Sequence, residues 1–175
     1  MNFLESERLL FRRLETSDFD ALFELYRDPE MRRYFQEGAL TAEETRGELM
    51  YFVNGGDAAH PELGLWAAIH KPTGAFVGRC GLIPWVIGGI LEVEGAYMIA
   101  KPFWRQGLGT EAAIALVKYG FEQLRLPRII ATIVHGNIAS ERTAKKAGLR
   151  LERRVENEVP PFAIYSFEKA ARAIN

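Results

Sequence analysis

The stretch LEVEGAYMIAKPFWRQGLGTEA, residues 91 to 112, decides the fold of this chain. Apolar side chains at alternate positions indicate a strand in its first part, which Pro102 ends. Gly107 and Gly109 then allow a tight turn, and apolar residues recur at helical spacing from Thr110 onward. The free N–H groups and the positive dipole end of that helix would lie beside the glycines. This order of elements predicts a binding site for an anion such as a phosphate.

Glycine turns at helix starts occur in several classes of protein, and three fit the pattern in part. A P-loop needs a lysine and a hydroxyl after its last glycine, whereas Gly109 is followed by Thr110 and Glu111. The dinucleotide-binding pattern GxGxxG/A fits the turn, but the next strand, at 128–134, lacks the acidic residue that would bind a ribose. An acyl-CoA-binding acetyltransferase is the third class. Arg105 would suit the pyrophosphate of CoA, because a guanidinium can bridge two oxygens.

The segment EGAYMIAKPFWRQGLGTEA resembles the acyl-CoA signature of the GNAT (GCN5-related N-acetyltransferase) superfamily, in particular its RimJ/RimL-type branch. That branch usually reads E-I-G-Y-W-L and, a few residues later, W-G-K-G-Y-A-T-E-A. The matching positions are Glu94, Gly95, Tyr97, Trp104, Gly107, Thr110, Glu111 and Ala112. Two positions differ, since Arg105 stands where the branch has glycine and Gln106 where it has a basic residue. The resemblance implies acetyl-CoA as co-substrate and no metal.

Composition favours one domain, residues 1–175, because 175 residues with 48% hydrophobic content can bury a sizeable core. The net charge is −1 and no block of Lys and Arg exceeds two residues, which does not favour nucleic acid or membrane as a partner. A single cysteine, Cys80, excludes an internal disulfide. No apolar run approaches about 18 residues, so we expect a cytoplasmic protein. The three histidines are too scattered for a zinc cluster.

The periodicity predicts an α/β fold. Strands are expected at 8–14, 63–70, 75–84, 91–99, 128–134, 149–155 and 162–168. Helices are expected after a cap at Thr16 or Ser17, from Thr41 to about Asn54, from Thr110 to about Leu124, and from Asn137 to Gly148. Turns at KPTG and Gly88-Gly89 make three successive strands antiparallel neighbours. The strands that flank the crossover helix should run parallel, which gives a mixed, mostly antiparallel sheet with helices on both faces.

In the resembling family this central parallel pair splays apart and admits the thioester arm of acyl-CoA. The resemblance assigns the backbone of Met98, Ile99 and Ala100 to that arm. The phosphates are then expected at the glycine turn, at Arg105, Gln106, Gly107, Leu108, Gly109 and Thr110. A backbone N–H near Met98 or Ile99 would meet the developing oxyanion.

Glu94 is the candidate general base, because an amine of lysine type is protonated near neutral pH and must lose a proton before it attacks. The residue stands where the branch has a glutamate. Strand alternation places Glu92 on the same face, and two neighbouring carboxylates would raise one of their pKa values. Against this role, a glutamate on a strand is more often a solvated edge residue.

The run Asn137-Ile-Ala-Ser140, followed by Lys146-Ala-Gly148-Leu149, resembles the second conserved block of the family, N-x-x-S then K-x-G-F. The resemblance implies that Asn137 holds the pantetheine arm or a water, and that Ser140 protonates the departing thiolate. Both residues are also ordinary at a helix start. His135 could relay protons, although a lone histidine at a strand end is more often structural.

The acceptor is expected to be an amine, either a protein N-terminus or a small molecule. The resemblance places its pocket at the connector between the first two helices, with Tyr34 and Phe35, at Trp85, and at the last hairpin near Phe162. Tyr34 and Phe35 could also simply pack the joint between the helices. A catalytically silent acyl-CoA-binding module is the alternative function, and a monomer and a homodimer are both open.

Overall fold

The computed structural model describes residues 2–168, which form one eight-stranded sheet in the order β1-β2-β3-β4-β5-β6-β8-β7. The strands are β1 Asn2–Glu5, β2 Leu9–Arg13, β3 Gly64–His70, β4 Phe76–Ile87, β5 Ile90–Ile99, β6 Arg128–Val134, β7 Arg150–Val155 and β8 Phe162–Glu168. The helices are α1 Phe19–Tyr26, α2 Ala42–Val53, α3 Leu108–Glu122 and α4 Ile138–Lys146, with 3-10 turns at Thr16–Asp18 and Lys101–Phe103.

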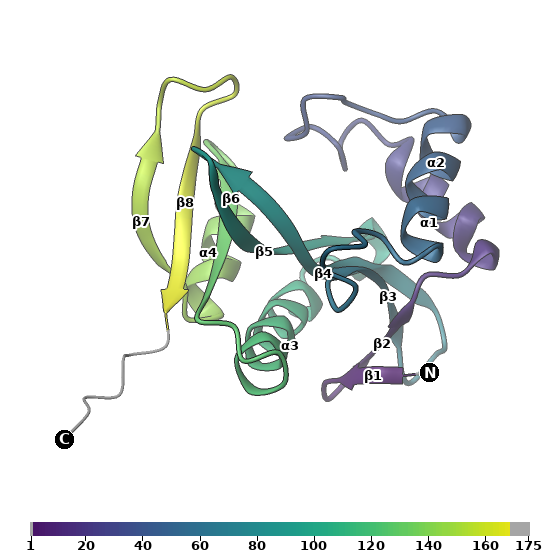
Figure 1. Cartoon of the computed structure of the whole chain (residues 1–175). Coiled ribbons are helices and arrows are strands. Elements are labelled where there is room, and N and C mark those ends of the chain that lie inside the picture. The colour runs from purple at the N-terminus through teal and green to yellow at the C-terminus, as the bar shows by residue number, and fades with distance from the viewer. Residues whose placement is uncertain (1, 169–175) are drawn as a thin grey trace.

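The predicted mixed sheet is confirmed. Each neighbouring pair of strands is antiparallel except β5 and β6, which run parallel on either side of the crossover through α3. Helices α1 and α2 pack on one face of the sheet, and α3 and α4 pack on the other (Figure 1). This arrangement is the α/β fold that the resemblance implied.

The start of the chain differs from the prediction in two details. Strand β1 was not predicted, because its few residues show no clear alternation and pairing with β2 through Leu4↔Phe11 defines it. The helix cap expected at Thr16 or Ser17 is also wrong, since Asp18 is the N-cap of α1 and Glu15 is the N-cap of the 3-10 turn before it. The Asp18 carboxylate accepts a hydrogen bond from Glu15 N at 2.8 Å and pairs with Arg12 at 2.7 Å, so a 3-10 turn precedes α1.

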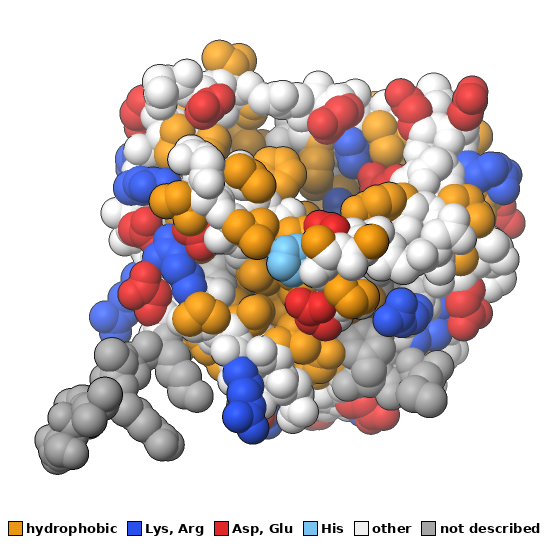
Figure 2. All heavy atoms as spheres, in the orientation of Figure 1, with side chains coloured by type: hydrophobic (Ala, Val, Ile, Leu, Met, Phe, Trp, Pro, Cys, Tyr) orange, Lys and Arg blue, Asp and Glu red, His pale blue; other side chains and the backbone are white. Residues whose placement is uncertain are grey.

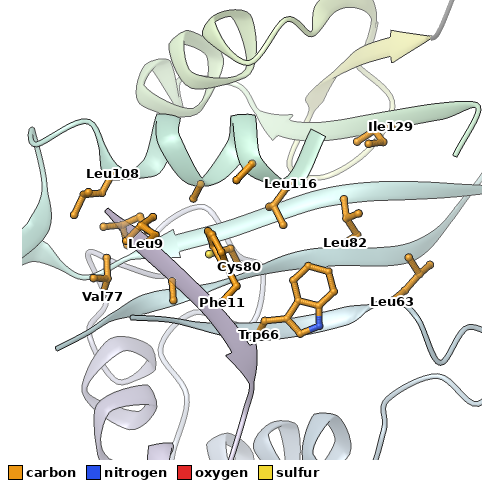
Figure 3. Close-up of a cluster of buried hydrophobic side chains, with 14 of the residues drawn as sticks. Leu9, Phe11, Leu63, Trp66, Val77, Cys80, Leu82, Leu108, Leu116 and Ile129 are labelled. Atoms are coloured by element: carbon orange, nitrogen blue, oxygen red, sulfur yellow. The ribbon is translucent and has the colours of Figure 1, made fainter. Parts of the chain in front are cut away.

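The hydrophobic core lies in two layers, one on each side of the sheet. Side chains from β2, β3 and β4 point toward α3, where Phe11, Trp66 and Leu82 meet Leu108 and Leu116 (Figure 3). On the opposite face, Leu22, Leu25 and Tyr26 of α1 and Leu49 of α2 cover the sheet. Each fully buried large apolar side chain contributes about 1.5–3 kcal/mol, so the two layers fix the middle of the sheet.

Among the described residues, the parallel strands β5 and β6 are in ladder register at one pair of residues only. Strands β4 and β5 pair continuously from Gly78↔Ile99 to Ile87↔Ile90, whereas β5 and β6 are in register at Glu94↔Ile130. Before that point Arg128 of β6 binds Glu92 of β5 at 3.0 Å and so clamps the two strands. After it the strands diverge (Figure 1), which leaves the β5 backbone unpaired on its β6 side. We call this stretch of β5, residues 95–99, the splayed segment.

Candidate active site

The N-terminus of α3 has a set of free backbone donors. Gly107 is the N-cap residue with φ +80°, a left-handed conformation that glycine adopts without steric cost. Glu111 N is the first helical N–H with a partner, Gly107 O at 3.0 Å. The N–H groups of Leu108, Gly109 and Thr110 have no acceptor in residues 2–168, and the helix dipole adds positive potential there. These donors fit the phosphates of CoA.

The turn is held in place from the start of the chain, which sequence reasoning missed. Glu111 accepts hydrogen bonds from Ser6 Oγ at 2.7 Å, Arg8 N at 2.6 Å and Arg8 Nε at 2.7 Å. Arg8 Nη1 donates to Gln106 O at 3.0 Å. Partial burial disfavours the charged carboxylate, but the hydrogen bonds from Ser6 and Arg8 outweigh it and hold the pKa of Glu111 below its usual value. An ionised Glu111 therefore anchors the turn to the segment before β2.

The two side chains that depart from the family pattern behave differently. Gln106 Nε2 donates to Pro102 O at 2.9 Å, so this amide stabilises the turn. Arg105 is exposed, forms no hydrogen bond or ion pair within residues 2–168, and has φ +62°. A left-handed conformation at this position explains why a glycine suits it in the family branch. Arg105 is thus the free cation beside the open N–H groups.

We expect Arg105→Ala to weaken the binding of acetyl-CoA about 3- to 10-fold, because an exposed cation contributes modestly to phosphate binding. The loss should shrink at high salt, where charges are screened. Arg105→Gly should lose the same affinity for acetyl-CoA. Its free energy of unfolding should be about 1 kcal/mol larger than that of Arg105→Ala, because glycine adopts the left-handed conformation without strain. Calorimetric titration at two salt concentrations and urea denaturation measure both effects. Equal affinities for wild type and Arg105→Ala would contradict a phosphate contact at this residue.

Backbone groups of β5 alternate between the β4 side and the splayed side. Ala100 N–H bonds to Val77 O at 2.8 Å. A Cβ on Gly78 would lie 2.0 Å from Met98 O, so that carbonyl also points to β4. Of the three residues assigned to the thioester arm, only Ile99 therefore directs its backbone to the splayed side, as does Tyr97 by strand alternation. Trp104 Nε1 donates a hydrogen bond to Ile99 O at 2.6 Å, so of the Ile99 backbone groups only the N–H remains as a free donor.

Glu94 lies directly before the splayed segment, at the point where β5 meets β6. Its Oε1 accepts hydrogen bonds from Thr132 N at 2.9 Å and from Thr132 Oγ1 on β6. Burial raises the pKa of Glu94, while the bonds from Thr132 and the positive charge of Arg79 act in the opposite direction. The idea that Glu92 raises this pKa is wrong, because Glu92 pairs with Arg128 and desolvation causes the shift. Glu94 is therefore a partly buried carboxyl suited to accept a proton.

A polar network beneath α1 was also missed by the sequence analysis. Arg79 of β4 donates from Nε to Tyr26 Oη at 3.0 Å, and Tyr26 Oη donates to Glu48 Oε1 of α2. Arg79 and Arg32 are 5% and 4% exposed. The signal was present in the sequence, since Arg79 interrupts the otherwise uncharged strand FVGRCGLIPW at an inward position. A buried arginine needs partners, which marks this region as functional or strongly structural.

The residues of the second motif lie together at the start of α4. Asn137 Oδ1 accepts from Ser140 N at 3.2 Å, so Asn137 is the helix cap. Tyr97 of the splayed segment donates from its hydroxyl to Ser140 Oγ at 3.3 Å. Ser140 therefore faces β5, as a proton donor to a thiolate in this region would have to do. His135 Nε2 is buried and has no hydrogen-bond partner among residues 2–168, and its Nδ1 lies 3.7 Å from Glu156.

The connector after α1 reaches across to the far half of the sheet. Tyr34 Oη donates to Gly136 O at 2.9 Å, and Gln36 bonds to Val159 O in the loop between β7 and β8. The guanidinium of Arg32 stacks 4.4 Å from the ring centre of Phe35, and that of Arg79 lies 5.8 Å from it. Figure 2 shows the surface hollowed between these two sides of the molecule, with basic side chains inside the hollow. Tyr34 and Phe35 thus border the face that carries Glu94.

Trp85 lies apart from that group. It pairs with Glu92 across β4 and β5, beyond the point where β5 meets β6, and is 47% exposed.

Residues 2–168 hold no cluster of three or more His, Cys, Asp or Glu side chains arranged for a metal ion. Within the same residues no helix has the length and apolar character needed to cross a membrane.

A sheet splayed beside free N–H groups at a helix start defines the class of acetyltransferases that take the acyl group from CoA. Residues 8–150 match the family model described as an acetyltransferase (GNAT) domain. The chain belongs to this GNAT acetyltransferase family. GNAT enzymes use acetyl-CoA, and this chain is an acetyltransferase of the GNAT family.

Relatives match along nearly the whole chain. The uncharacterized protein YkkB of Bacillus subtilis (strain 168) is 33% identical over 93% of each chain. The uncharacterized N-acetyltransferase YnaD of the same organism is 30% identical over 85% of this chain and 83% of its own. A GNAT-family acetyltransferase structure from Bacillus anthracis superposes with a TM-score of 0.81 and 27% identity, covering 95% of this chain and 98% of its own.

Two more distant structures share the fold alone. A spermidine N-acetyltransferase from Vibrio cholerae, in complex with CoA and spermine, has a TM-score of 0.77 and 17% identity over 93% of this chain and 96% of its own. A ribosomal-protein-S5-alanine acetyltransferase from Vibrio fischeri has a TM-score of 0.76 and 15% identity over 97% of both chains.

Proposed function

We propose that this acetyltransferase moves the acetyl group of acetyl-CoA to a primary amine by direct attack in a ternary complex. The observation that carries the proposal is Glu94, a partly buried carboxyl with a raised pKa that lies directly before the splayed segment and is held there by Thr132. An alkyl ammonium must lose a proton before its nitrogen can attack, and a base of raised pKa takes that proton efficiently near neutral pH.

The donor side is supplied by the turn before α3. The N–H groups of Leu108, Gly109 and Thr110, the N-cap Gly107 and the Arg105 side chain would hold the phosphates, with Gln106 bracing the turn. The thioester arm would lie along the splayed segment, with Asn137 at its far wall. There it could use the Ile99 N–H and the backbone of Tyr97, which have no partner on the β6 side within residues 2–168.

Groups that line one cleft would accept the proton that the amine loses and supply the proton that the thiolate gains. Glu94 accepts the proton that the amine loses, and the nitrogen forms a bond to the thioester carbonyl carbon. The Ile99 N–H would stabilise the negative charge that develops on the carbonyl oxygen. The carbon–sulfur bond then breaks, and the thiolate takes a proton from Ser140 Oγ, which Tyr97 can replenish through their 3.3 Å hydrogen bond.

Thermal unfolding with acetyl-CoA, CoA and NADH in parallel tests the donor site. A ligand at about 100 times its Kd adds about 2.7 kcal/mol of stability. For a chain of this size that corresponds to about 5–10 °C in Tm. We expect both CoA species to raise Tm and NADH to leave it unchanged. Release of CoA thiol with a panel of amines tests the transfer, and CoA binding without turnover of any amine would favour the alternative, a catalytically silent acyl-CoA-binding module.

We expect Ser140→Ala to lower kcat about 10- to 100-fold at neutral pH with little change in the Kd of acetyl-CoA, because it removes the donor for the thiolate. Tyr97→Phe should cost less, since it removes only the group that replenishes Ser140. Stopped-flow detection of the thiol measures both variants. If Tyr97→Phe is the slower enzyme and Ser140→Ala matches wild type, the tyrosine is the acid and Ser140 serves only as a helix-start residue.

A further inference from the structure

We propose that the amine accepted by this enzyme also carries a carboxylate, and that Arg79 binds this carboxylate. The inference rests on the proposed function and narrows its acceptor to amino acids and related anionic amines. Arg79 lies on β4 directly across from Met98 of β5, on the face of the sheet covered by α1. Arg79 is therefore close to the splayed segment, on the sheet face where the connector after α1 also lies.

Arg79 keeps donors available although the residue is almost buried. Only its Nε has a hydrogen-bond partner within residues 2–168, namely Tyr26 Oη at 3.0 Å. In that part of the chain the one side-chain polar atom that is both fully buried and without a partner is His135 Nε2. The two Nη groups of Arg79 are therefore unpartnered and still accessible, through the 5% of the side chain that remains exposed.

The charged groups near Arg79 include one further arginine and two glutamates, both of which are bound by other groups. Arg32 and Arg79 share the same aromatic rings, at 5.4 Å and 5.7 Å from the centre of Tyr26. Opposite them, Glu48 is engaged by the Tyr26 hydroxyl, and the exposed Glu37 binds Arg32 at 3.2 Å. No carboxylate forms an ion pair with Arg79 in the described chain. An anionic group would therefore find a guanidinium without an ion-pair partner here.

A carboxylate is the group that this guanidinium fits. Two parallel Nη–H donors match the two oxygens of a carboxylate, and a charged pair gains strength in a site that excludes water. Arg79 and Glu94 lie on the same face, because Met98 and Glu94 are four residues apart on β5, a span of about 13 Å between backbones. Their long side chains shorten that distance. An acceptor bound to Arg79 through its carboxylate would thus extend its amine toward Glu94.

The test compares matched acceptors that differ only in the carboxylate. Free amino acids, dipeptides and ω-amino acids are each paired with the corresponding carboxamide, and CoA release is measured with acetyl-CoA. We expect kcat/KM to favour the acid over its amide by about 10- to 100-fold, the usual range for a hydrogen-bonded charge. The amide carries the less basic amine, which is more easily deprotonated, so its intrinsic reactivity works against this expectation. Equal values for acids and amides would overturn the proposal.

Variants then assign the preference to Arg79. Arg79→Met should reduce the acid-to-amide ratio to about 3-fold or less, and Arg79→Lys should retain part of it, because a point charge replaces the bidentate fork. The Tm shift with acetyl-CoA should be unchanged in both, since the donor site is elsewhere. Arg27→Met, which removes an exposed arginine from the end of α1, is the matched control and should keep the wild-type ratio. If Arg79→Met does not fold, the wild-type comparison and Arg79→Lys still decide the matter.

Binding without turnover separates this proposal from the proposed function. Calorimetric titration of each acid and amide into the protein saturated with CoA reports on the acceptor site alone. If no amine is acetylated but acids bind more tightly than amides and lose this preference in Arg79→Lys, the transferase mechanism fails and the carboxylate site stands. If amides are acetylated and bound as well as acids, the mechanism stands and the carboxylate site is refuted.

Discussion

Replacement of Glu94 by Gln should lower kcat about 100- to 10,000-fold, the range typical of a lost general base. The amide keeps the oxygen that accepts the two hydrogen bonds from Thr132, so the cleft should keep its shape. Affinity for acetyl-CoA should therefore change little. Steady-state kinetics with a saturating amine, together with a titration of acetyl-CoA, would separate the chemical step from binding.

The same substitution should change stability in a way that depends on pH. Burial raises the pKa of Glu94 in the folded protein, so its favourable contribution is complete at low pH and is lost as pH rises through that raised value. The Gln variant does not ionise. The difference in Tm between the variant and wild type should move in the variant's favour as pH rises above 4.5, the ordinary value, and then level off. Thermal unfolding between pH 4 and pH 9 records it.

Glu92→Gln is the control for this prediction. Glu92 lies on the same face, but Arg128 already neutralises it at 3.0 Å, so its loss should reduce kcat far less than the loss of Glu94. Activity of Glu94→Gln within about 3-fold of wild type would rule out Glu94 as the base. A larger loss for Glu92→Gln than for Glu94→Gln would reverse the assignment.

Substitution of Gly81 by Ala should destabilise the protein by about 3 kcal/mol or more, through a clash between backbones. A Cβ at Gly81 would lie 1.9 Å from Gly64 O, 2.8 Å from Gly64 C and 2.9 Å from Leu65 Cα. All three atoms belong to the main chain of β3, so relief requires β3 and β4 to separate in the middle of the sheet. Tm should fall by about 6–12 °C, and urea denaturation would measure the free energy.

Gly47→Ala makes the same chemical change with the opposite expected sign. Gly47 lies inside α2, and a Cβ there would meet no atom within 4 Å. Alanine in a helix interior is more favourable than glycine by about 0.5–1 kcal/mol, so this variant should be slightly more stable than wild type. Similar losses of stability in both variants would show that contact between β3 and β4 is not the cause.

Much of the fold was predictable because it depends on neighbours in the sequence. Alternating apolar residues, the left-handed Gly107, the hairpin glycines and the Asn137 cap act over a few residues, and each was recognised from its local pattern. The order strand, glycine turn, helix, strand then required a parallel pair within an antiparallel sheet. The position of the glycine turn before α3 followed from the same stretch.

Local pattern did not reveal how the candidate site is held and charged. The three backbone assignments on β5 ignored strand alternation, which turns Met98 and Ala100 toward β4. The missed contacts join distant parts of the chain, since Glu111 binds Arg8 across 103 residues and Arg79 binds Tyr26 across 53. No periodicity in one segment specifies such a partner.

The sequence by itself determined the class of fold and the position of the glycine turn before α3, because backbone conformation and apolar periodicity are local properties. Only the tertiary structure decided the chemistry of the cleft. Burial, and not Glu92, raises the pKa of Glu94, and packing of α1 on β4 leaves Arg79 with free donors near it. Desolvation and charge depend on which surfaces meet in space, so they arise only when the chain has folded.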